Sequence, residues 1–263
     1  MSAPSFETLA LESVNEHVTI VRLNRPDASN ALNTQMGRDL VRCFEDVALA
    51  KLRCIVLTGT GDKAFCAGGD LKERRGMTDE QWTRQHVIFE RMVRALIDCP
   101  VPIIGAVNGA AYGGGCEIAG ACDFLYAADS ARFALTEVTL GIMPGSGGTQ
   151  TLPRAVGERR AKELILTGKP FSAAQAHGWG LVNEVFAQAD LLREALATAA
   201  RIARNAPISV RQAKLSIHRG LQSSLRDGLA LQIEAYNRMV PTEDRREGVL
   251  AFNEKRPPDF RGR

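Results

Sequence analysis

The chain has 263 residues, of which 45% are hydrophobic and 24% are charged, a composition typical of a globular rather than a disordered protein. Lysine and arginine exceed aspartate and glutamate by 33 − 30 = 3 charges, a balance that argues against a dedicated nucleic-acid binder. The six cysteines form no C-x-x-C pair, and the start lacks a basic segment followed by an apolar run. We therefore expect reduced thiols and a cytoplasmic protein.

The first half of the chain alternates predicted strands and helices. Two alternating runs, about Thr8 to Val14 and His17 to Leu23, predict a β-hairpin. Apolar residues recur at helical spacing from Thr34 to Ala50, and a continuous apolar strand follows at Cys54 to Leu57. A capping box at Thr78 begins a helix that extends to about Asp98.

The same alternation continues beyond Pro100. Apolar strands are predicted at Ile103 to Val107 and Phe124 to Ala127, with a glycine loop and a short helix between them. The uncharged stretch from Cys99 to Cys116 contains prolines and several glycines, so we exclude a membrane helix. A second capping box opens a short helix at Ser172, before a strand-like segment from Leu181 to Phe186.

Strands without a polar face that alternate with helices indicate an α/β fold with a mostly parallel sheet covered on both sides. After Asp190 the pattern becomes helical almost to the end, with breaks at Pro207, Gly220 and Pro241. We therefore predict an α/β core over residues 1–190 and a helical C-terminal region over residues 191–263.

Two glycine-rich turns directly follow predicted strands, Phe65 to Leu71 and Gly113 to Glu117. Glycine lets a ligand approach the backbone, and a helix that begins at such a turn leaves its first N–H groups without helical partners. These donors attract negative charge. Either turn alone is more typical of tight packing. Together, two turns can direct one N–H each at a single oxygen, which is an oxyanion hole.

Two glutamates stand in apolar surroundings near these turns. Glu117 follows the second turn directly. Glu137 follows the segment Phe133 to Thr136 and precedes Val138. Burial raises the pKa of a carboxyl group toward neutrality, as acid–base catalysis requires. From the sequence alone, two ordinary surface glutamates remain an alternative.

Three segments carry a resemblance to a known family: F-C-A-G-G-D-L-K-E from Phe65, N-G-A-A-Y-G-G-G-C-E from Asn108, and F-A-L-T-E-V-T-L-G-I-M-P-G-S-G-G-T-Q from Phe133. In this order and spacing they resemble the crotonase superfamily, the enoyl-CoA hydratases and isomerases. The resemblance continues to the terminal F-N-E-K-R-P-P and so covers essentially the whole chain.

The resemblance implies an α/β spiral of ββα units with C-terminal trimerisation helices, assembled as a homo-trimer or homo-hexamer. By position, it places the oxyanion amides at Gly69 and Gly114 and the hydratase carboxylates at Glu117 and Glu137. The implied reaction adds water across the α,β double bond of an acyl-CoA thioester.

The resemblance also implies positions that bind the coenzyme A part of the substrate: Ala28, Ala67, Gly69, Asp70, Leu71, Phe252 and Lys255. The last two match a family pair that often reaches the nucleotide from a neighbouring subunit. Because coenzyme A belongs to the substrate, no separate cofactor is implied. The four histidines include no H-E-x-x-H, so we expect no metal site.

Two positions depart from the family pattern. Gly69 stands where many hydratases have alanine, and Thr136 replaces a common proline, as it does in the methylglutaconyl-CoA hydratase branch. That branch shares L-K-E-R after the first turn, so an acidic acyl tail that meets Arg74 or Arg75 is an alternative to solvated arginines.

Other functions remain as alternatives. An isomerase would use the same enolate with mainly one glutamate. A relative of the methylglutaconyl branch binds RNA, but the corresponding helix, Thr34 to Lys51, carries no net charge and is a poor phosphate binder. There is no phosphate-loop or G-x-S-x-G motif. We expect an acyl-CoA substrate, no nucleic acid and no membrane partner.

Overall fold

The computed structural model describes residues 5–45 and 51–263, and these form two sheets. The larger sheet runs in the order β1 (Leu9–Ser13), β2 (Val18–Leu23), β3 (Cys54–Gly59), β5 (Ile103–Val107), β7 (Phe124–Ala128) and β10 (Glu184–Phe186). The smaller sheet runs in the order β4 (Ala64–Cys66), β6 (Ala110–Tyr112), β8 (Arg132–Ala134) and β9 (Phe171–Ser172). Neighbouring strands are parallel except for the β1–β2 and β8–β9 pairs.

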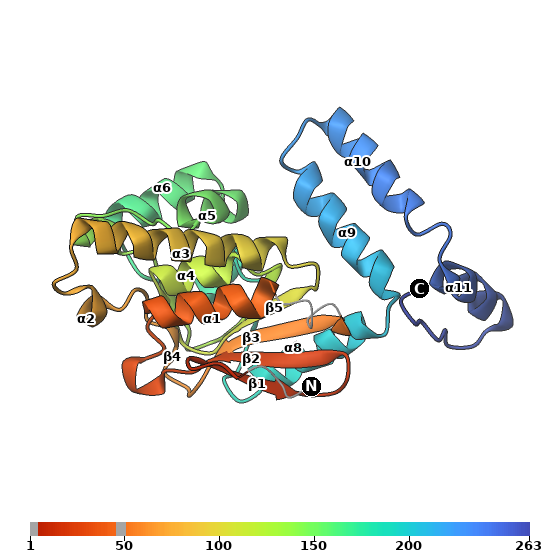
Figure 1. Ribbon diagram of the computed structural model, residues 1–263, viewed down its shortest axis with the longest axis horizontal. Helices are drawn as coiled ribbons and strands as arrows, with labels where there is room; N and C mark the ends of the chain where they lie inside the picture. Colours follow the sequence, from red (N-terminus) through yellow and green to blue (C-terminus); the bar gives the residue numbers. More distant parts are fainter. Residues whose placement is uncertain (1–4, 46–50) are drawn as a thin grey trace.

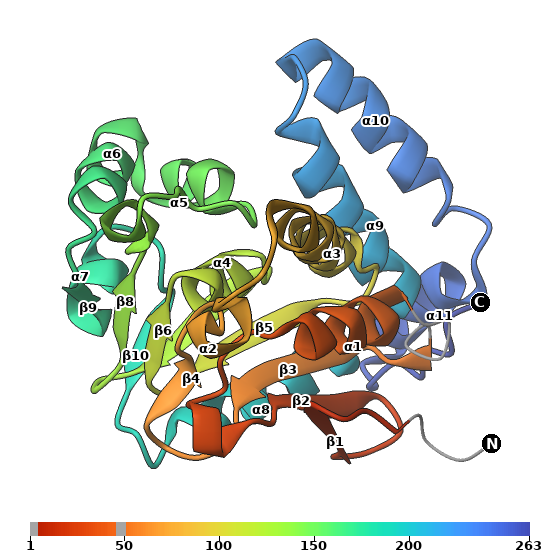
Figure 2. The same cartoon turned by 60° about the vertical axis from the view of Figure 1, so that its left-hand side comes forward.

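The chain passes from the larger sheet to the smaller sheet and then into a helix three times, as Figure 2 shows. The helical segments that close these repeats are α2 (Leu71–Arg74) with α3 (Asp79–Asp98), α4 (Gly114–Gly120), and η3 (Glu137–Leu140) with α5 (Gly148–Val156) and α6 (Glu158–Thr167). This is the spiral of ββα units that the resemblance implied, and the predicted α/β class is confirmed.

Helices cover both faces of the larger sheet (Figure 1). The strands β3 and β5 are buried throughout, as expected for strands without a polar face. On one face α1 (Thr34–Glu45) lies beside α3. On the other face α8 (Leu191–Ala203) packs against the sheet and buries Ala195 and Ala199 completely. Although α8 follows the predicted boundary at residue 190, its packing joins it to the sheet.

The remaining helices leave the sheet. Helix α9 (Pro207–Gly220) begins with proline at its first position, where no helical N–H is lost. Helix α10 (Leu225–Asn237) folds back antiparallel to α9, and this hairpin projects from the body of the protein before α11 (Glu243–Glu254) (Figure 1). The predicted helical character after Asp190 is confirmed. No helix in the described parts of the chain is long and apolar enough to cross a membrane.

Most predicted elements occur where the sequence pattern placed them. Both capping boxes form, at Thr78 before α3 and at Ser172 before α7 (Ala173–Gly178). Of the helix predicted from Thr34 to Ala50, the described part ends at Glu45, and residues 46–50 lie outside the described residues. The apolar pattern did not predict the smaller sheet, because its strands are only two or three residues long.

Candidate active site

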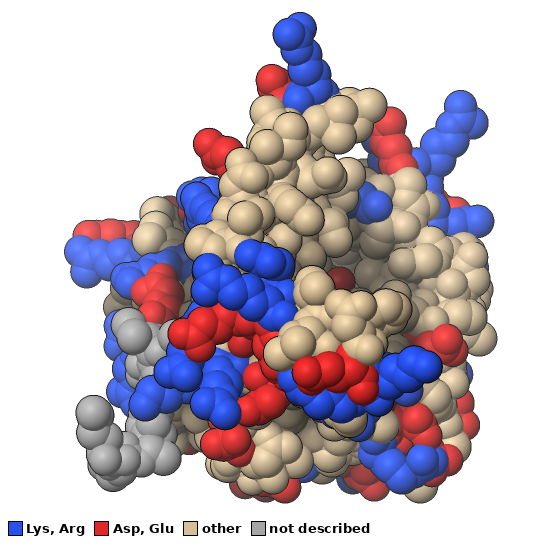
Figure 3. Space-filling model, turned by 90° about the vertical axis from the view of Figure 1, so that its right-hand side faces the viewer, with Lys and Arg blue, Asp and Glu red and all other residues tan. Residues whose placement is uncertain are grey.

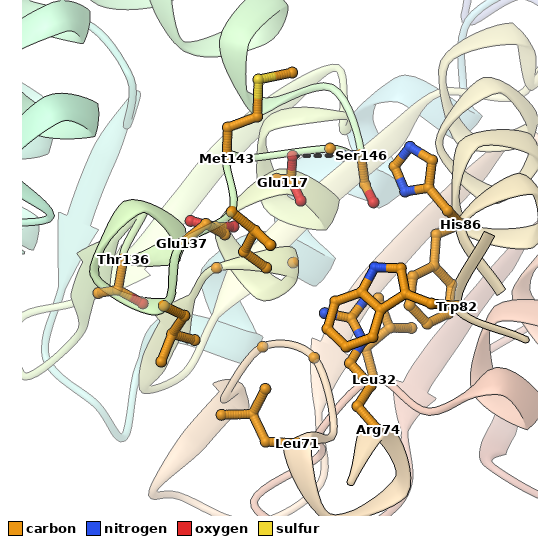
Figure 4. Close-up of a pocket in the computed structure, with 18 of the residues that line it drawn as sticks. Leu32, Leu71, Arg74, Trp82, His86, Glu117, Thr136, Glu137, Met143 and Ser146 are labelled. Carbon is orange, nitrogen blue, oxygen red and sulfur yellow. Dashed lines mark hydrogen bonds between the residues drawn. The ribbon is translucent and has the colours of Figure 1, made fainter. Parts of the chain in front are cut away.

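A cavity of about 460 Å³ opens where the loops of the three ββα units meet. Six residues singled out in the sequence contribute to its wall: Ala67, Gly69, Leu71, Gly114, Glu117 and Glu137. Its volume lies in the range of about 300–1,000 Å³ common for small-molecule sites. Figure 4 shows Glu117 and Glu137 directed into the same space.

The two predicted oxyanion amides lie side by side. A Cβ atom on Gly114 would be 3.9 Å from the amide nitrogen of Gly69. Among the described residues, neither of these two N–H groups donates a hydrogen bond to protein. Two unpaired donors from two separate loops thus border one cavity, which is the arrangement an oxyanion needs.

Glycines allow the two loops to approach this closely. A Cβ atom on Gly115, at the start of α4, would lie only 2.1 Å from the carbonyl oxygen of Cys66 at the end of β4. Gly68 has φ +99°, and a Cβ there would lie 2.8 Å from the carbonyl oxygen of Tyr112. A larger residue at either position would force the loops apart.

The loop that carries Gly69 is held in place by a neighbouring segment. Leu32 N donates to Gly68 O at 2.8 Å, and Asp70 N donates to Leu32 O at 2.9 Å. The Asp70 carboxylate accepts from the backbone at the start of α2 and forms an ion pair with Arg25 at 2.9 Å. Burial alone would raise the pKa of Asp70, but these hydrogen bonds and Arg25 lower it overall. Asp70 therefore supports the loop and contributes no side chain to the cavity.

Glu117 is buried and fixed by the first turn of α5. Its Oε1 accepts hydrogen bonds from Ser146 N at 2.7 Å and Gly148 N at 2.9 Å. Burial raises the pKa of Glu117 to about 7, opposed by the Gly148 and Ser146 N–H groups and helped by the charge of Glu137. A carboxyl group with this pKa exchanges protons readily near neutral pH.

Glu137 is the first residue of η3 and faces the cavity from the opposite loop. Its Oε2 is buried and has no hydrogen-bond partner within the described residues. Burial raises the pKa of Glu137 as well, while its own backbone N–H and Arg74 oppose the rise. An unpartnered carboxyl oxygen in a cavity is available to a bound water or substrate.

The cavity contains several polar groups, of which the sequence analysis had weighed only Arg74 as a site residue. Trp82 and His86 project from α3, Ser146 precedes α5, and Arg74 lies at the end of α2 (Figure 4). Arg74 was weighed as a solvated loop residue, with a contact to an acidic acyl tail as the alternative, and its guanidinium lies in the cavity wall. The spacing of Trp82, His86 and Phe89 on one helical face was the signal available in the sequence.

The predicted coenzyme A positions lie in two parts of the chain, one at or beside the cavity loop and the other in the C-terminal region. Ala28 ends the short helix η1 (Pro26–Ala28), and the next residue is joined to the cavity loop by Ala67 N, which donates to Ser29 O at 3.1 Å. Phe252 and Lys255 belong to α11 and its C-terminal cap, away from the cavity lining in this single chain. Their proposed contact with the nucleotide stays a prediction.

The described residues also bear on a metal site and on the helix weighed for RNA binding. No group of three or more His, Cys, Asp or Glu side chains placed to hold a metal ion occurs in residues 5–45 and 51–263. In the helix weighed for RNA binding, Arg42 stacks on the Phe6 ring at 4.5 Å and Glu45 pairs with Arg91. Of the segment weighed for RNA binding, residues 46–50 lie outside the described residues.

Comparison with known proteins places the chain in a family. Residues 13–263 match the family described as enoyl-CoA hydratase/isomerase. The protein YngF of Bacillus subtilis is 46% identical over 249 residues, which are 94% of this chain and 96% of that protein. The chain belongs to the enoyl-CoA hydratase/isomerase family. The resemblance seen in the sequence segments is thereby confirmed.

Further members of the enoyl-CoA hydratase/isomerase family are similar over nearly their whole length. The short-chain-enoyl-CoA hydratase of Clostridium acetobutylicum is 40% identical, with 91% of this chain and 92% of that protein covered. The crystal structure of enoyl-CoA hydratase from Bacillus anthracis has a TM-score of 0.94 at 42% identity, with 98% of this chain and 100% of that chain covered. The crotonase-type fold is thus shared at full length.

Proposed function

We propose that this protein is an enoyl-CoA hydratase that adds water across the α,β double bond of an acyl-CoA thioester. One observation carries the proposal: the amides of Gly69 and Gly114, unpaired among the described residues, share a cavity with the buried carboxyl groups of Glu117 and Glu137. The names of similar proteins, including the short-chain-enoyl-CoA hydratase of Clostridium acetobutylicum, support the same reaction.

In the proposed reaction, the thioester oxygen binds between the amides of Gly69 and Gly114. The oxygen of a water held by Glu117 and Glu137 forms a bond to the β-carbon, and the π electrons move toward the thioester oxygen. The two N–H donors stabilise this developing enolate, an effect worth about 10²–10³ in rate for each donor. One proton passes from a glutamate to the α-carbon, and the water returns one proton to the carboxylates, so that one water is added in total.

The environment of the two glutamates supports their proposed role. Burial raises the pKa of both carboxyl groups, and the pKa of about 7 for Glu117 makes its protonated form available near neutral pH, as proton delivery to carbon requires. The two hydrogen bonds to Glu117 Oε1 leave its Oε2 for the water. The reaction so written needs neither a metal nor a separate cofactor.

For the rest of the substrate, we propose that the backbone from Ala67 to Leu71 and the segment near Ala28 bind the pantetheine and adenine portions. Phe252 and Lys255 would reach the nucleotide of a neighbouring subunit. The 83% exposure of Phe252 in the single chain fits a residue that contacts something outside that chain.

The C-terminal helices support a homo-trimer or a hexamer of two trimers. Apolar residues recur at spacings of four, four and three along one side of α10, where Leu225, Leu229, Ile233 and Tyr236 are at least half exposed. Figure 3 views the molecule from the side that carries the C-terminal helices, and uncharged residues gather in its upper part, where α10 lies. An exposed apolar area of this kind marks an association surface. The cytoplasmic location stays a prediction.

The direct test incubates the purified protein with crotonyl-CoA and follows the loss of absorbance from the conjugated thioester. We expect hydration, with a mass gain of one water in the product. A parallel assay with a 3-enoyl-CoA distinguishes the isomerase alternative, because isomerisation creates conjugation without a mass change. If neither neutral nor acidic short 2-enoyl thioesters are hydrated, the proposal is wrong.

A further inference from the structure

Leu32, which lies between η1 and α1, contacts both of the loops that carry the proposed oxyanion amides. Its backbone pairs with the first loop on both sides of Gly69. Leu32 N donates to Gly68 O at 2.8 Å, and Asp70 N donates to Leu32 O at 2.9 Å. Its side chain reaches the second loop, because a Cβ atom on Gly114 would lie 3.1 Å from Leu32 Cδ2 and 3.9 Å from Gly69 N. Leu32 thus lies in the cavity wall where the two amides approach each other (Figure 4).

The segment that carries Leu32 is anchored on both sides of that residue. Before it, Asn30 is fully buried, and its Nδ2 donates to Ala64 O at 2.9 Å, at the start of β4. After it, Thr34 N donates to Glu73 Oε2 at 2.9 Å, which joins the start of α1 to α2. Leu32 itself is 1% exposed. Because its neighbours are tied to the surrounding elements, Leu32 can serve as a fixed spacer between the two loops.

The side chain of Leu32 offers the two amides no hydrogen-bond acceptor. Within residues 5–45 and 51–263, Gly69 N and Gly114 N donate to no protein group, and the methyl groups of a leucine cannot compete for them. Leu32 also belongs to the apolar core, so it keeps water away from the protein side of the amides. Donors in such a dry setting act more strongly on a developing negative charge than donors in water.

We propose that Leu32 is a positioning residue for the oxyanion site. Its backbone sets the direction of Gly69 N–H, and its side chain sets the distance from that amide to Gly114 N–H. This inference rests on the proposed reaction through an oxyanion hole. Both donors must lie within hydrogen-bond distance of one oxygen at the same time, so a change in their separation weakens one of the two bonds. A misplacement of about 1 Å can cost about 100-fold in rate.

A competing role is that Leu32 only fills space in the apolar core. The two roles differ in what they predict for the folded enzyme. A residue that only fills space contributes to stability, and shortening it leaves kcat unchanged. A positioning residue contributes to kcat with little effect on KM, because the bonds to the thioester oxygen strengthen as the enolate forms.

The test compares variants that shorten a buried leucine by one carbon. Leu32→Val withdraws the side chain from Gly114, and we expect kcat for crotonyl-CoA to fall about 10- to 100-fold with little change in KM. Leu57→Val, at a fully buried position of β3 outside the cavity lining, is the matched control. It should lose similar stability in urea and keep the kcat of the wild type. Leu32→Met nearly conserves the volume and should retain most of kcat.

The carbonyl stretch of a bound thioester reports on the two hydrogen bonds without turnover. Butanoyl-CoA, isotope-labelled at the carbonyl carbon, is saturated and cannot be hydrated. Infrared difference spectra should show its carbonyl band shifted to lower frequency on binding to the wild type. The shift should be smaller in Leu32→Val and complete in Leu57→Val.

The outcomes separate this inference from the proposed function. Equal band shifts and equal kcat in the wild type and Leu32→Val overturn the positioning role and leave the hydratase assignment intact. A fall in kcat that Leu57→Val shares also overturns it. A wild type that shifts the band but hydrates no 2-enoyl thioester counts against the proposed function, and the infrared comparison then decides the role of Leu32. A wild type that binds butanoyl-CoA without any shift overturns the oxyanion pair and the role of Leu32 together.

Discussion

The amide nitrogen of Gly148 lies 2.9 Å from Oε1 of Glu117, so the first turn of α5 holds a carboxylate that belongs to α4. A Cβ atom on Gly148 would lie 3.1 Å from that same oxygen. The glycine therefore allows the approach, and Ser146 adds a second N–H at 2.7 Å. This contact couples two of the segments that carry the family resemblance, and it fixes one of the two proposed catalytic groups.

Replacing either proposed catalytic glutamate should remove most of the activity. We expect Glu117→Gln and Glu137→Gln each to lower kcat for crotonyl-CoA by about 10²–10⁴, because an acid–base group is lost. Glutamine keeps the shape and can still accept from Ser146 N, so binding of coenzyme A should survive. The exposed Glu184→Gln on β10 is the matched control and should behave as wild type. Retained activity in both site variants would end the two-carboxylate assignment.

The raised pKa of Glu117 predicts a pH dependence of stability. In an unfolded chain the pKa of a glutamate is about 4.3, whereas burial raises the pKa of Glu117 to about 7 in the folded protein. Between these values the folded state binds more protons, so the free energy of unfolding falls as pH rises, by up to about 1.4 kcal/mol per pH unit.

The measurement for this dependence is urea unfolding of wild type and Glu117→Gln at one protein concentration across that pH window. The variant has no proton to lose at this position, so it should gain stability relative to wild type as pH rises. The difference should level off above the pKa of about 7. Stability curves that run parallel through the window would contradict the raised pKa.

Much of the fold was predictable because its signals are local. Continuous apolar runs identified β3 and β5, and the Thr78 capping box located the start of α3 to the residue. The smaller sheet was harder to predict, because strands such as β4 span three residues and their pairing is set by long-range contacts. Composition after residue 190 indicated helices correctly, but it does not show which of them, such as α8, return to the sheet.

The sequence predicted the parts of the candidate site that consist of glycine-rich turns and of carboxylates in apolar surroundings, because such residues have few structural roles. The residue pattern indicated the two glycine turns, Glu117 and Glu137, and the family resemblance then placed the amides at Gly69 and Gly114. All four residues line one cavity. Arg74 was weighed mainly as solvated, because an arginine in a charged stretch is usually exposed. Its burial depends on the bulk of Trp82 and on Gln85, which lies eleven residues away in sequence. Local sequence does not show such a contact.

Close packing of the two glycine turns should make Gly115 intolerant of a side chain. In Gly115→Ala, the added methyl would meet the Cys66 carbonyl oxygen at 2.1 Å, and a backbone atom has no rotamer with which to yield. We expect a loss of about 1–3 kcal/mol in stability, measured by urea unfolding, together with reduced kcat as the two amides separate. Gly178→Ala is the control, because a Cβ there meets nothing within 4 Å. If Gly115→Ala matches this control in both measurements, the close-approach argument is wrong.

The proposed association surface predicts the behaviour of α10 variants. Leu229→Asp places a charge in the exposed apolar row and should convert trimers or hexamers to smaller species, measured as mass by light scattering. Arg226→Asp, on the same helix but outside that row, should leave the assembly unchanged. If Phe252 and Lys255 serve a neighbouring subunit, dissociation should also raise KM. A monomeric wild-type protein would exclude this role for α10.

The most direct measurement is a crystal structure of the protein bound to acetoacetyl-CoA, a thioester that is not hydrated. The account predicts that the thioester oxygen accepts hydrogen bonds from both Gly69 N and Gly114 N, at about 2.7–3.2 Å, with Glu117 and Glu137 facing the acyl carbons. A thioester oxygen bound elsewhere, with these two amides left unpaired, would contradict the account.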